Sequence, residues 1–309
     1  MRPSAHVRVA VDLRRVRTNA QAIRQLTGVP LIAVVKADAY GLGAERTTLT
    51  LADLVDRFCV FSPDEAIRID LWQRTGKPAL AIGPPATLDP TDYVAHHIHP
   101  AVSTAQQAAA LRSARPVVCV DTGQQRFACP MENVAETFDQ GHCDEAYTHA
   151  ATLQQVQMLQ DAVAHRRARL HAAGSSLLNE PAAWLDAVRP GLALYRGSVR
   201  VSTQLVENRK STGPAGYSGF TAPYHGVILA GYSNGLKAGP CLVNGHPSRI
   251  LEVGMQSAFV ETQPTDRAGD EVILLGDSIS EQHIASAWNT SPHECLVRLT
   301  SLGVREYIE

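Results

Sequence analysis

Lys36 is the residue whose type and position point most directly to chemistry. It follows five apolar residues, Leu31 to Val35, and precedes small residues, a tyrosine and two glycines. An ammonium group buried at the end of an apolar strand is unfavourable unless it is paired or neutral. A neutral lysine amine can form a Schiff base with an aldehyde, and pyridoxal phosphate is the common biological aldehyde. The alternative is a lysine that extends to the rim of an ordinary strand.

Alternating strands and helices must position this lysine. A continuous apolar run such as 31–35 is typical of a strand covered on both faces. About eight such strand–helix units would form a (β/α)8 barrel, whose active site lies at the carboxyl ends of the strands, where Lys36 falls. Periodicity predicts strands at 6–11, 31–35, 58–61, 79–83, 115–123, 145–150 and 169–172, and helices at 13–26, 46–56, 63–74, 104–113 and 153–165.

The pattern changes after Val199. Residues 205–225 are rich in Gly, Ser, Thr and Pro, and beyond them short apolar runs alternate with turn signals such as Asn244-Gly245. This texture predicts an all-β domain. We therefore expect a barrel domain at 12–200 and a C-terminal β-domain at 201–309, joined by the N-terminal strand 5–11. The predicted short strands are GVILAG, CLVNG, SRILEVG, SAFVET, EVILLG and ECLVRLT.

Composition excludes several classes of protein. The chain has 309 residues, is 45% hydrophobic and carries a formal net charge of −2, which gives no reason to expect nucleic acid or a membrane as a partner. It contains no run of eighteen apolar residues, and its N-terminus does not resemble a signal peptide. The six scattered cysteines lack zinc-site spacing, so we expect reduced thiols in a cytoplasmic protein and no metal.

Two motifs identify a family resemblance. The stretch VVKADAYGLG (34–43) closely resembles the lysine motif of alanine racemase, a fold-type III pyridoxal phosphate enzyme, and VRPGLALYRG (188–197) resembles its RPGIALYG motif. The similarity recurs along nearly the whole chain. It implies a (β/α)8 barrel followed by a smaller, mostly β C-terminal domain. It also implies an isomerase that interconverts L- and D-alanine.

The resemblance implies a role for each matching barrel residue. Lys36 would hold pyridoxal phosphate and act as one of two acid/base groups. Arg126, in VDTGQQRF (120–127), would neutralise the phenolate of the cofactor or the substrate carboxylate. The other implied cofactor contacts are Tyr40 at the phosphate, His149 in YTHAA beside the pyridine ring, Ser175 in HAAGSSLL, Arg189, and the backbone N–H groups of Gly191 and Leu192.

Arg189 carries a chemical consequence. It would face the pyridine nitrogen, and an arginine does not give up its proton in a protein. The ring nitrogen therefore stays an unprotonated acceptor, and the ring withdraws electrons less strongly than one paired with an aspartate. A weaker electron sink favours clean removal and return of the Cα proton over side reactions.

The second acid/base group is implied to come from the C-terminal domain. In GYSGFTAP (216–223) the resemblance makes Tyr217 this group, acting opposite Lys36. A phenol with a pKa of about 10 needs a cationic neighbour to act near neutrality. In the family this tyrosine belongs to the partner subunit, which implies a homodimer with shared active sites. Tyr232 would line the substrate entrance, Met255 would offer its N–H to the substrate carboxylate, and Tyr307 would bind phosphate.

Some positions depart from the family pattern and leave alternatives open. Cys119 stands where many members carry a carbamylated lysine that orients the arginine. Gln256 and Asn234 replace aspartates near the substrate. These changes leave open a racemase of another small amino acid, or an inactive or regulatory pyridoxal phosphate-binding homologue. A fold-type III decarboxylase is the other alternative, although those enzymes pair the ring nitrogen with an acidic residue where this chain offers Arg189.

Overall fold

The computed structural model describes residues 3–309, which form two compact units. The barrel unit consists of Val16–Ala39 and Gly43–Leu194. The β unit consists of the N-terminal residues up to Arg15, the short segment Tyr40–Leu42, and Tyr195–Glu309. Within the described residues, no helix combines the length and the apolar character needed to cross a membrane.

The barrel unit contains seven parallel strands in chain order, closed by an eighth segment. The strands pair in the order β2-β3-β4-β5-β6-β7-β8. Residues 186–190 close the ring, because Val188 bridges Leu31 on one side and Ala187 bridges His171 on the other. The strands are β2 Ile32–Val34, β3 Arg57–Val60, β4 Ala79–Ala81, β5 Ile98–Val102, β6 Val117–Cys119, β7 Glu145–Ala150 and β8 Arg169–Ala173.

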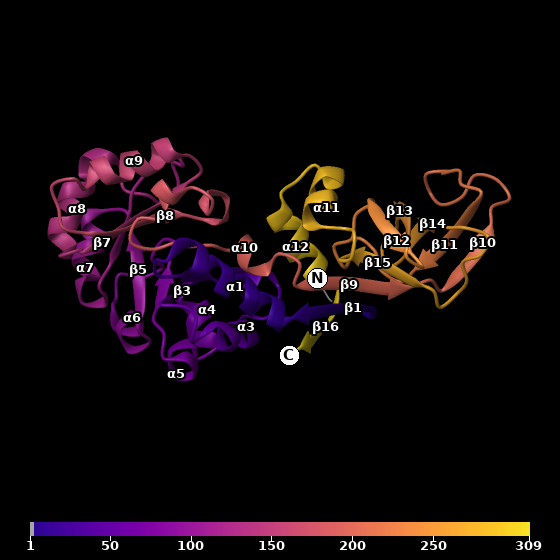
Figure 1. Cartoon of the computed structure of the whole chain (residues 1–309), viewed down its shortest axis with the longest axis horizontal. Coiled ribbons are helices and arrows are strands. Elements are labelled where there is room, and N and C mark those ends of the chain that lie inside the picture. Colours follow the sequence, from indigo (N-terminus) through magenta and orange to yellow (C-terminus); the bar gives the residue numbers. More distant parts are fainter. Residues whose placement is uncertain (1–2) are drawn as a thin grey trace. The chain divides into compact units, whose positions relative to one another are not determined.

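The barrel prediction is confirmed, with helices covering the outside of the strands (Figure 1). Buried Leu80, Ala101, Val117, Cys119 and Tyr147 pack together as part of its core. The helices are α1 Leu13–Thr27, α3 Ala44–Leu51, α4 Pro63–Arg68, α5 Leu71–Thr75, α6 Thr91–Ala95, α7 Ala105–Ala110, α8 Val134–Gly141 and α9 Leu153–Ala162.

Several parts of the barrel differ from the periodicity prediction. The single helix expected at 63–74 is two helices, α4 and α5, because Asp70 adopts a left-handed conformation (φ 47°) that ends the first helix. Sequence periodicity missed α6, β5 and α8 altogether. Helix α6 has five residues, too few to show a helical period, and β5 contains His99 and Pro100, which interrupt an apolar run.

The β unit is built on one nine-stranded sheet. Its order is β10-β11-β14-β13-β12-β15-β9-β1-β16. The N-terminal strand β1 pairs antiparallel with β9 and parallel with β16. The strands are β1 Ser4–Asp12, β9 Val199–Gln204, β10 Glu207–Lys210, β11 Tyr224–Ile228, β12 Pro240–Val243, β13 His246–Val253, β14 Ala258–Glu261, β15 Glu271–Leu275 and β16 Gly303–Ile308.

Turn chemistry sets the register of one hairpin of this sheet. Asn244 and Gly245 both have positive φ, 48° and 81°, as a type I′ turn requires. They connect Val243 of β12 directly to its partner His246 of β13.

The expectation that the C-terminal region is all-β, with ECLVRLT as a strand, is wrong. Residues 294–300 lie in helix α12 Pro292–Thr300, which follows helix α11 Glu281–Trp288. Ser291 caps α12 by accepting the N–H of Glu294, and Pro292 occupies its first turn. The buried residues Cys295, Leu296 and Leu299 repeat at helical spacing, and this periodicity outweighs the strand propensity of the short run.

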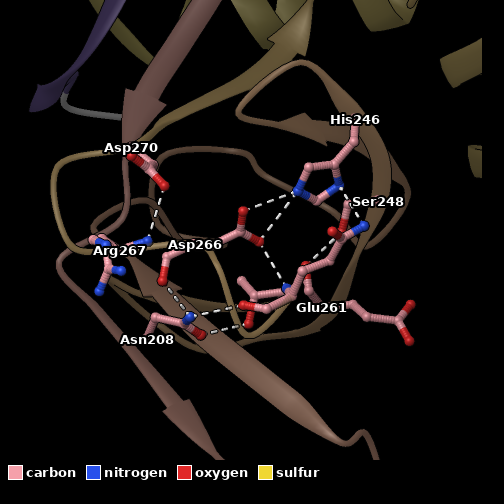
Figure 2. Close-up of polar contacts among 9 residues, drawn as sticks. Asn208, His246, Ser248, Glu261, Asp266, Arg267 and Asp270 are labelled. Carbon is pink, nitrogen blue, oxygen red and sulfur yellow. Dashed lines mark hydrogen bonds and ion pairs between the residues drawn. The ribbon is translucent and has the colours of Figure 1, made fainter.

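A polar cluster that contains none of the predicted site residues stabilises the β unit. Figure 2 shows Asp266 and His246 pointing toward each other. The Asp266 carboxylate accepts from His246 Nε2 at 3.0 Å and from the Gln263 N–H at 2.7 Å. Asn208 donates to the backbone carbonyl of Asp266. Because Asp266 is buried and its carboxylate has these partners, we assign the cluster to folding.

Candidate active site

Lys36 follows directly after β2, and an unusual backbone turn fixes its place. Residues Ala37 to Tyr40 all have φ between 53° and 58°, a short left-handed helical turn. Such a conformation costs roughly 1–2 kcal/mol per non-glycine residue, so the surroundings must impose it. The Asp38 carboxylate accepts the Ala44 N–H at 2.7 Å, and Val35 O accepts the Ala39 N–H at 2.8 Å. The turn therefore fixes the backbone position from which the Lys36 side chain extends.

Glu65 holds the start of this turn, and sequence reasoning missed it. Its carboxylate accepts the Ala37 N–H at 2.9 Å and the Phe61 N–H at 2.6 Å. These two donors belong to the ends of neighbouring strands β2 and β3. The carboxylate thus joins the two strand ends beside Lys36. A glutamate in the first turn of a helix gives no sequence signal for such a bridge.

Arg189 is buried and held by a chain of side chains. Only 5% of its surface is exposed. Arg189 Nη1 lies 2.7 Å from His171 Nδ1, and Nη2 donates to the Thr148 carbonyl at 3.1 Å. His171 Nε2 lies 2.9 Å from Glu145 Oε1, and Glu145 is held by both terminal nitrogens of Arg57, at 3.0 and 2.8 Å. We call Arg57, Glu145, His171 and Arg189 the barrel network.

Charges in the barrel network are determined by burial and hydrogen bonding. Burial lowers the pKa of His171 to about 4, so its imidazole is neutral. Burial alone would raise the pKa of Glu145, but the His171 hydrogen bond and the Arg57 charge outweigh it and hold that pKa well below its usual range. Because arginine only donates, His171 Nδ1 must accept from Arg189 and Nε2 must donate to Glu145. Glu145 neutralises Arg57, and Arg189 keeps a net positive charge.

The charges of Lys36 and Arg189 both lower the pKa of the same buried thiol, Cys59. Burial raises the pKa of Cys59 to about 11, and the positive charges of Arg189 and Lys36 both oppose that rise. Cys59 lies on β3 next to β2, and its backbone carbonyl accepts the Val35 N–H at 2.8 Å. The Val34 N–H donates to Pro190 O at 3.0 Å, so the segment that carries Arg189 runs beside the strand that precedes Lys36.

Cys119 is a buried thiol at the end of β6. Burial raises its pKa, and Cys119 packs with Tyr147 in the barrel core. The Tyr147 ring stacks on His171 at a centroid distance of 5.3 Å and lies 4.5 Å from the Arg189 guanidinium carbon. Cys119 thus supports the aromatic ring beneath Arg189.

Ser175 joins the end of β8 to the RPG motif. Ser175 Oγ accepts the N–H groups of Gly191 at 3.1 Å and Ala193 at 3.0 Å. Because its oxygen accepts both, the Ser175 hydroxyl proton remains to be donated. The sequence predicts that the N–H groups of Gly191 and Leu192 bind phosphate, but the Gly191 N–H is bound to Ser175 in this structure. The Ser175 hydroxyl at this turn suits an anion such as phosphate.

Arg126 and His149 lie at the carboxyl ends of β6 and β7 and are exposed. Asp121 shapes the loop of Arg126 by accepting the N–H groups of Gly123 at 2.8 Å and Gln125 at 3.0 Å. The Arg126 guanidinium lies 5.8 Å from the Phe127 ring centroid. Parallel strands end at one edge of the barrel, so both side chains lie at the end where Lys36 lies.

Three predicted residues of the β unit lie on adjacent loops. Tyr217, Tyr232 and Met255 are 94%, 55% and 61% exposed. Backbone bonds join the loops of Tyr232 and Met255: the Tyr232 N–H donates to Gly254 O at 2.9 Å and the Ser233 N–H to Met255 O at 3.0 Å. An ideal Cβ on Gly254 would lie 3.9 Å from Tyr217 Cε2. The β unit therefore gathers these three side chains on one surface.

Tyr40 and Tyr307 also belong to the β unit. Tyr40 is 7% exposed, and its ring centroid lies 5.1 Å from that of Tyr195 and 5.9 Å from that of His293. Helix α12 supports the turn, because Thr300 Oγ1 donates to Tyr40 O at 3.1 Å. Tyr307 lies on β16 opposite Val11 of β1. His293 is an aromatic neighbour that no sequence pattern indicated.

The donor set fits pyridoxal phosphate. Lys36 supplies an amine, and Ser175 supplies a hydroxyl that can donate to a phosphate. Arg189 supplies a charged donor whose geometry is fixed by burial. Among the described residues, no group of three or more His, Cys, Asp or Glu side chains could hold a metal ion. The arrangement suits an organic, phosphate-bearing group.

Comparisons with known proteins cover both units. The family described as "Alanine racemase, N-terminal domain" matches residues 11–199, and "Alanine racemase, C-terminal domain" matches residues 214–307. The biosynthetic alanine racemases of Escherichia coli (strain K12) and Salmonella typhimurium (strain LT2) are each 30% identical to the chain, with 97% of this chain and 99% of each relative covered.

Solved structures share the whole fold. The alanine racemase of Bartonella henselae, with covalently bound pyridoxal phosphate, superposes with a TM-score of 0.87 at 22% identity, covering 99% of this chain and 100% of that one. The biosynthetic alanine racemase of Pseudomonas aeruginosa gives a TM-score of 0.87 at 23% identity, covering 100% of both chains.

Proposed function

Since this chain belongs to the alanine racemase family, we propose that it interconverts L- and D-alanine with pyridoxal phosphate as its cofactor. The observation that carries the proposal is the combination of Lys36 at the end of β2 with Arg189 held as a buried cation nearby. Both residues stand in the motifs that match the family.

The chain's own residues have distinct tasks in this reaction. Pyridoxal phosphate, when bound, supplies an aldehyde for an amine and a ring that withdraws electrons from Cα. Lys36 would hold the cofactor and move a proton on one face of Cα. Tyr217 would move the proton on the other face. Two groups on opposite faces are needed because a single group would return the proton to the face from which it came.

Arg189 would set the reaction type. Its guanidinium would donate to the ring nitrogen and leave that nitrogen unprotonated, because an arginine does not give up its proton and the neutral His171 beside it only accepts from it. The described residues place no carboxylate in contact with Arg189; the nearest acidic group of the barrel network, Glu145, contacts His171 instead. This arrangement favours return of the proton over the decarboxylation that an acidic partner would support.

The remaining predicted residues would bind phosphate and substrate. Ser175, Gly191, Leu192, Tyr40 and Tyr307 would hold the phosphate, and His149 would lie beside the ring. Arg126 and the Met255 N–H would bind the carboxylate, with Tyr232 at the entrance. Cys119, Gln256 and Asn234 depart from the family pattern within or beside the matching motifs, so we include other small amino acids as candidate substrates.

We further propose a cytoplasmic homodimer with shared active sites. Tyr217 is 94% exposed in the single chain, as expected for a side chain that serves a partner subunit. All six cysteines are free, which suits a reducing compartment.

A heavy-water assay tests the reaction. The purified protein is incubated with L- or D-alanine and with a panel of other small amino acids. Racemisation with deuterium at Cα is expected, and it should vanish in Lys36→Ala together with the visible absorption of the bound cofactor. Release of CO2 would indicate a decarboxylase, and a bound cofactor without exchange would indicate an inactive homologue.

A further inference from the structure

Glu252 accepts hydrogen bonds from the loop that carries Tyr217. Its carboxylate accepts two consecutive backbone N–H groups, from Tyr217 at 2.8 Å on Oε1 and from Ser218 at 2.6 Å on Oε2. Hydrogen bonds from the Ser218 side chain and from these two N–H groups lower the pKa of Glu252, so the carboxylate is the form that the loop stabilises. A side chain on β13 thereby fixes the backbone of Tyr217.

Gly216 is required for this contact. It has a φ of +69°, and a Cβ at this position would lie 2.6 Å from Glu252 Oε1 and 2.8 Å from Oε2. A side chain would therefore push the carboxylate away from the loop. The glycine before Tyr217 and the glutamate 36 residues later in the chain are structurally complementary.

The base of the loop is fixed independently. Ala215 and Phe220 form an antiparallel bridge in which the Ala215 N–H donates to Phe220 O at 2.9 Å. The Phe220 ring packs against Phe259 of β14, with centroids 5.2 Å apart. The base alone leaves the tip, residues 217–219, free to rotate about its ends. The Glu252 carboxylate is the side chain that removes this freedom.

The phenol of Tyr217 is not oriented by side-chain partners. Within residues 3–309, no hydrogen bond is made by its hydroxyl, and the side chain is 94% exposed. Its backbone conformation therefore fixes the Cα–Cβ direction from which the phenol extends. We propose that Glu252 is the positioning residue for Tyr217, setting the phenol where it exchanges a proton with Cα.

This inference rests on the proposed function and predicts a specific loss. In Glu252→Gln an NH2 group replaces one of the two acceptor oxygens, so one of the two N–H groups faces a donor where it had an acceptor. A misplacement of about 1 Å in a reacting group can lower a rate about 100-fold. Racemisation needs both Lys36 and Tyr217, whereas exchange of the Cα proton with retained configuration needs Lys36 alone.

The test compares these two reactions in heavy water. For Glu252→Gln we expect racemisation to fall by about 100-fold while exchange with retained configuration, seen with one of the two alanine enantiomers, stays near the wild-type rate. Tyr217→Phe should show the same split. The double variant should be no slower than Tyr217→Phe, because Glu252 acts through Tyr217.

Glu261→Gln is the matched control. Glu261 lies on neighbouring strand β14, and its carboxylate pairs with Arg249 at 2.8 Å without contacting the Tyr217 loop. Both reactions should keep their wild-type rates in this variant.

Each alternative outcome has a definite meaning. Wild-type behaviour of Glu252→Gln beside an impaired Tyr217→Phe would overturn the role of Glu252 and leave the proposed function standing. Equal loss of racemisation and exchange in Glu252→Gln would show general damage and also overturn it. Wild-type racemisation by Tyr217→Phe would instead refute the proposed acid/base role of Tyr217.

Discussion

The two units hold their functional side chains in opposite ways. In the barrel unit, Arg189 is 5% exposed, and its side chain is held at the end of a buried chain of hydrogen bonds and ion pairs. In the β unit, Tyr217 is 94% exposed and is held through its backbone by Glu252. A group that must keep a fixed charge is buried among partners. A group that must meet a substrate or another subunit is exposed, and only its main chain is fixed.

This contrast predicts that the barrel network is important for folding as well as for activity. Glu145→Ala leaves Arg57 buried without its partner, and breaking a buried pair in this way costs about 3–5 kcal/mol. We expect denaturant unfolding to show this loss in the free energy of unfolding. Glu261→Ala, which breaks the exposed pair with Arg249, is the control and should cost no more than about 1 kcal/mol. Equal effects of the two changes would contradict the contrast.

The pH dependence of stability should reveal the neutral histidine. The pKa of His171 falls from 6.5 to about 4 on folding, so below pH 6.5 the unfolded chain binds a proton that the folded chain does not. Stability is then lost as pH falls from 6.5 towards 4, by about 3 kcal/mol for this group. Burial lowers the pKa of His99 to about 4 as well, and it contributes in the same direction.

Urea unfolding between pH 7 and pH 4.5 measures this slope. His171→Gln should remove the His171 share of the slope and leave the His99 share. An unchanged slope in His171→Gln would mean that His171 is not the neutral link assumed between Glu145 and Arg189.

The cluster around Asp266 provides a buried network without a catalytic task. Asp266→Asn removes the charge that His246 and the Gln263 N–H contact, and we expect it to lower the free energy of unfolding by about 1–3 kcal/mol. Racemisation at a temperature where the variant is folded should keep its wild-type rate. A selective loss of kcat in the folded variant would show that burial alone does not separate the two networks.

The smallest effect on stability is expected at Tyr217. Because its phenol is exposed and bonds to none of the described residues, Tyr217→Phe should change the free energy of unfolding by no more than about 0.5 kcal/mol. Thermal and denaturant unfolding of the same sample used for the exchange assay would measure this. A larger loss would mean that the hydroxyl helps to hold the loop.

Local patterns in the sequence predict much of the fold and part of the site. Apolar runs such as 31–35 indicated buried parallel strands, and the Asn244-Gly245 pair indicated a hairpin; both follow from short-range sterics and periodicity. Helix α12 was mistaken for a strand, although Ser291 and Pro292 carry a helix-start signal. The segment 186–190, which closes the barrel, makes only isolated bridges and is not a regular strand, and periodicity did not predict a strand there.

The sequence by itself determined the motifs, most of the barrel strands, and the positions of Lys36 and Arg189 relative to them, because these depend on residues close together in the chain. Only the tertiary structure decided what fixes those residues: Glu65 beneath the Lys36 turn, Glu145 and Arg57 behind Arg189, and Glu252 under Tyr217. Each of these carboxylates finds its donors on other elements. Such pairs leave no local pattern, since folding alone brings together groups that are distant in sequence and removes the water that would otherwise solvate them.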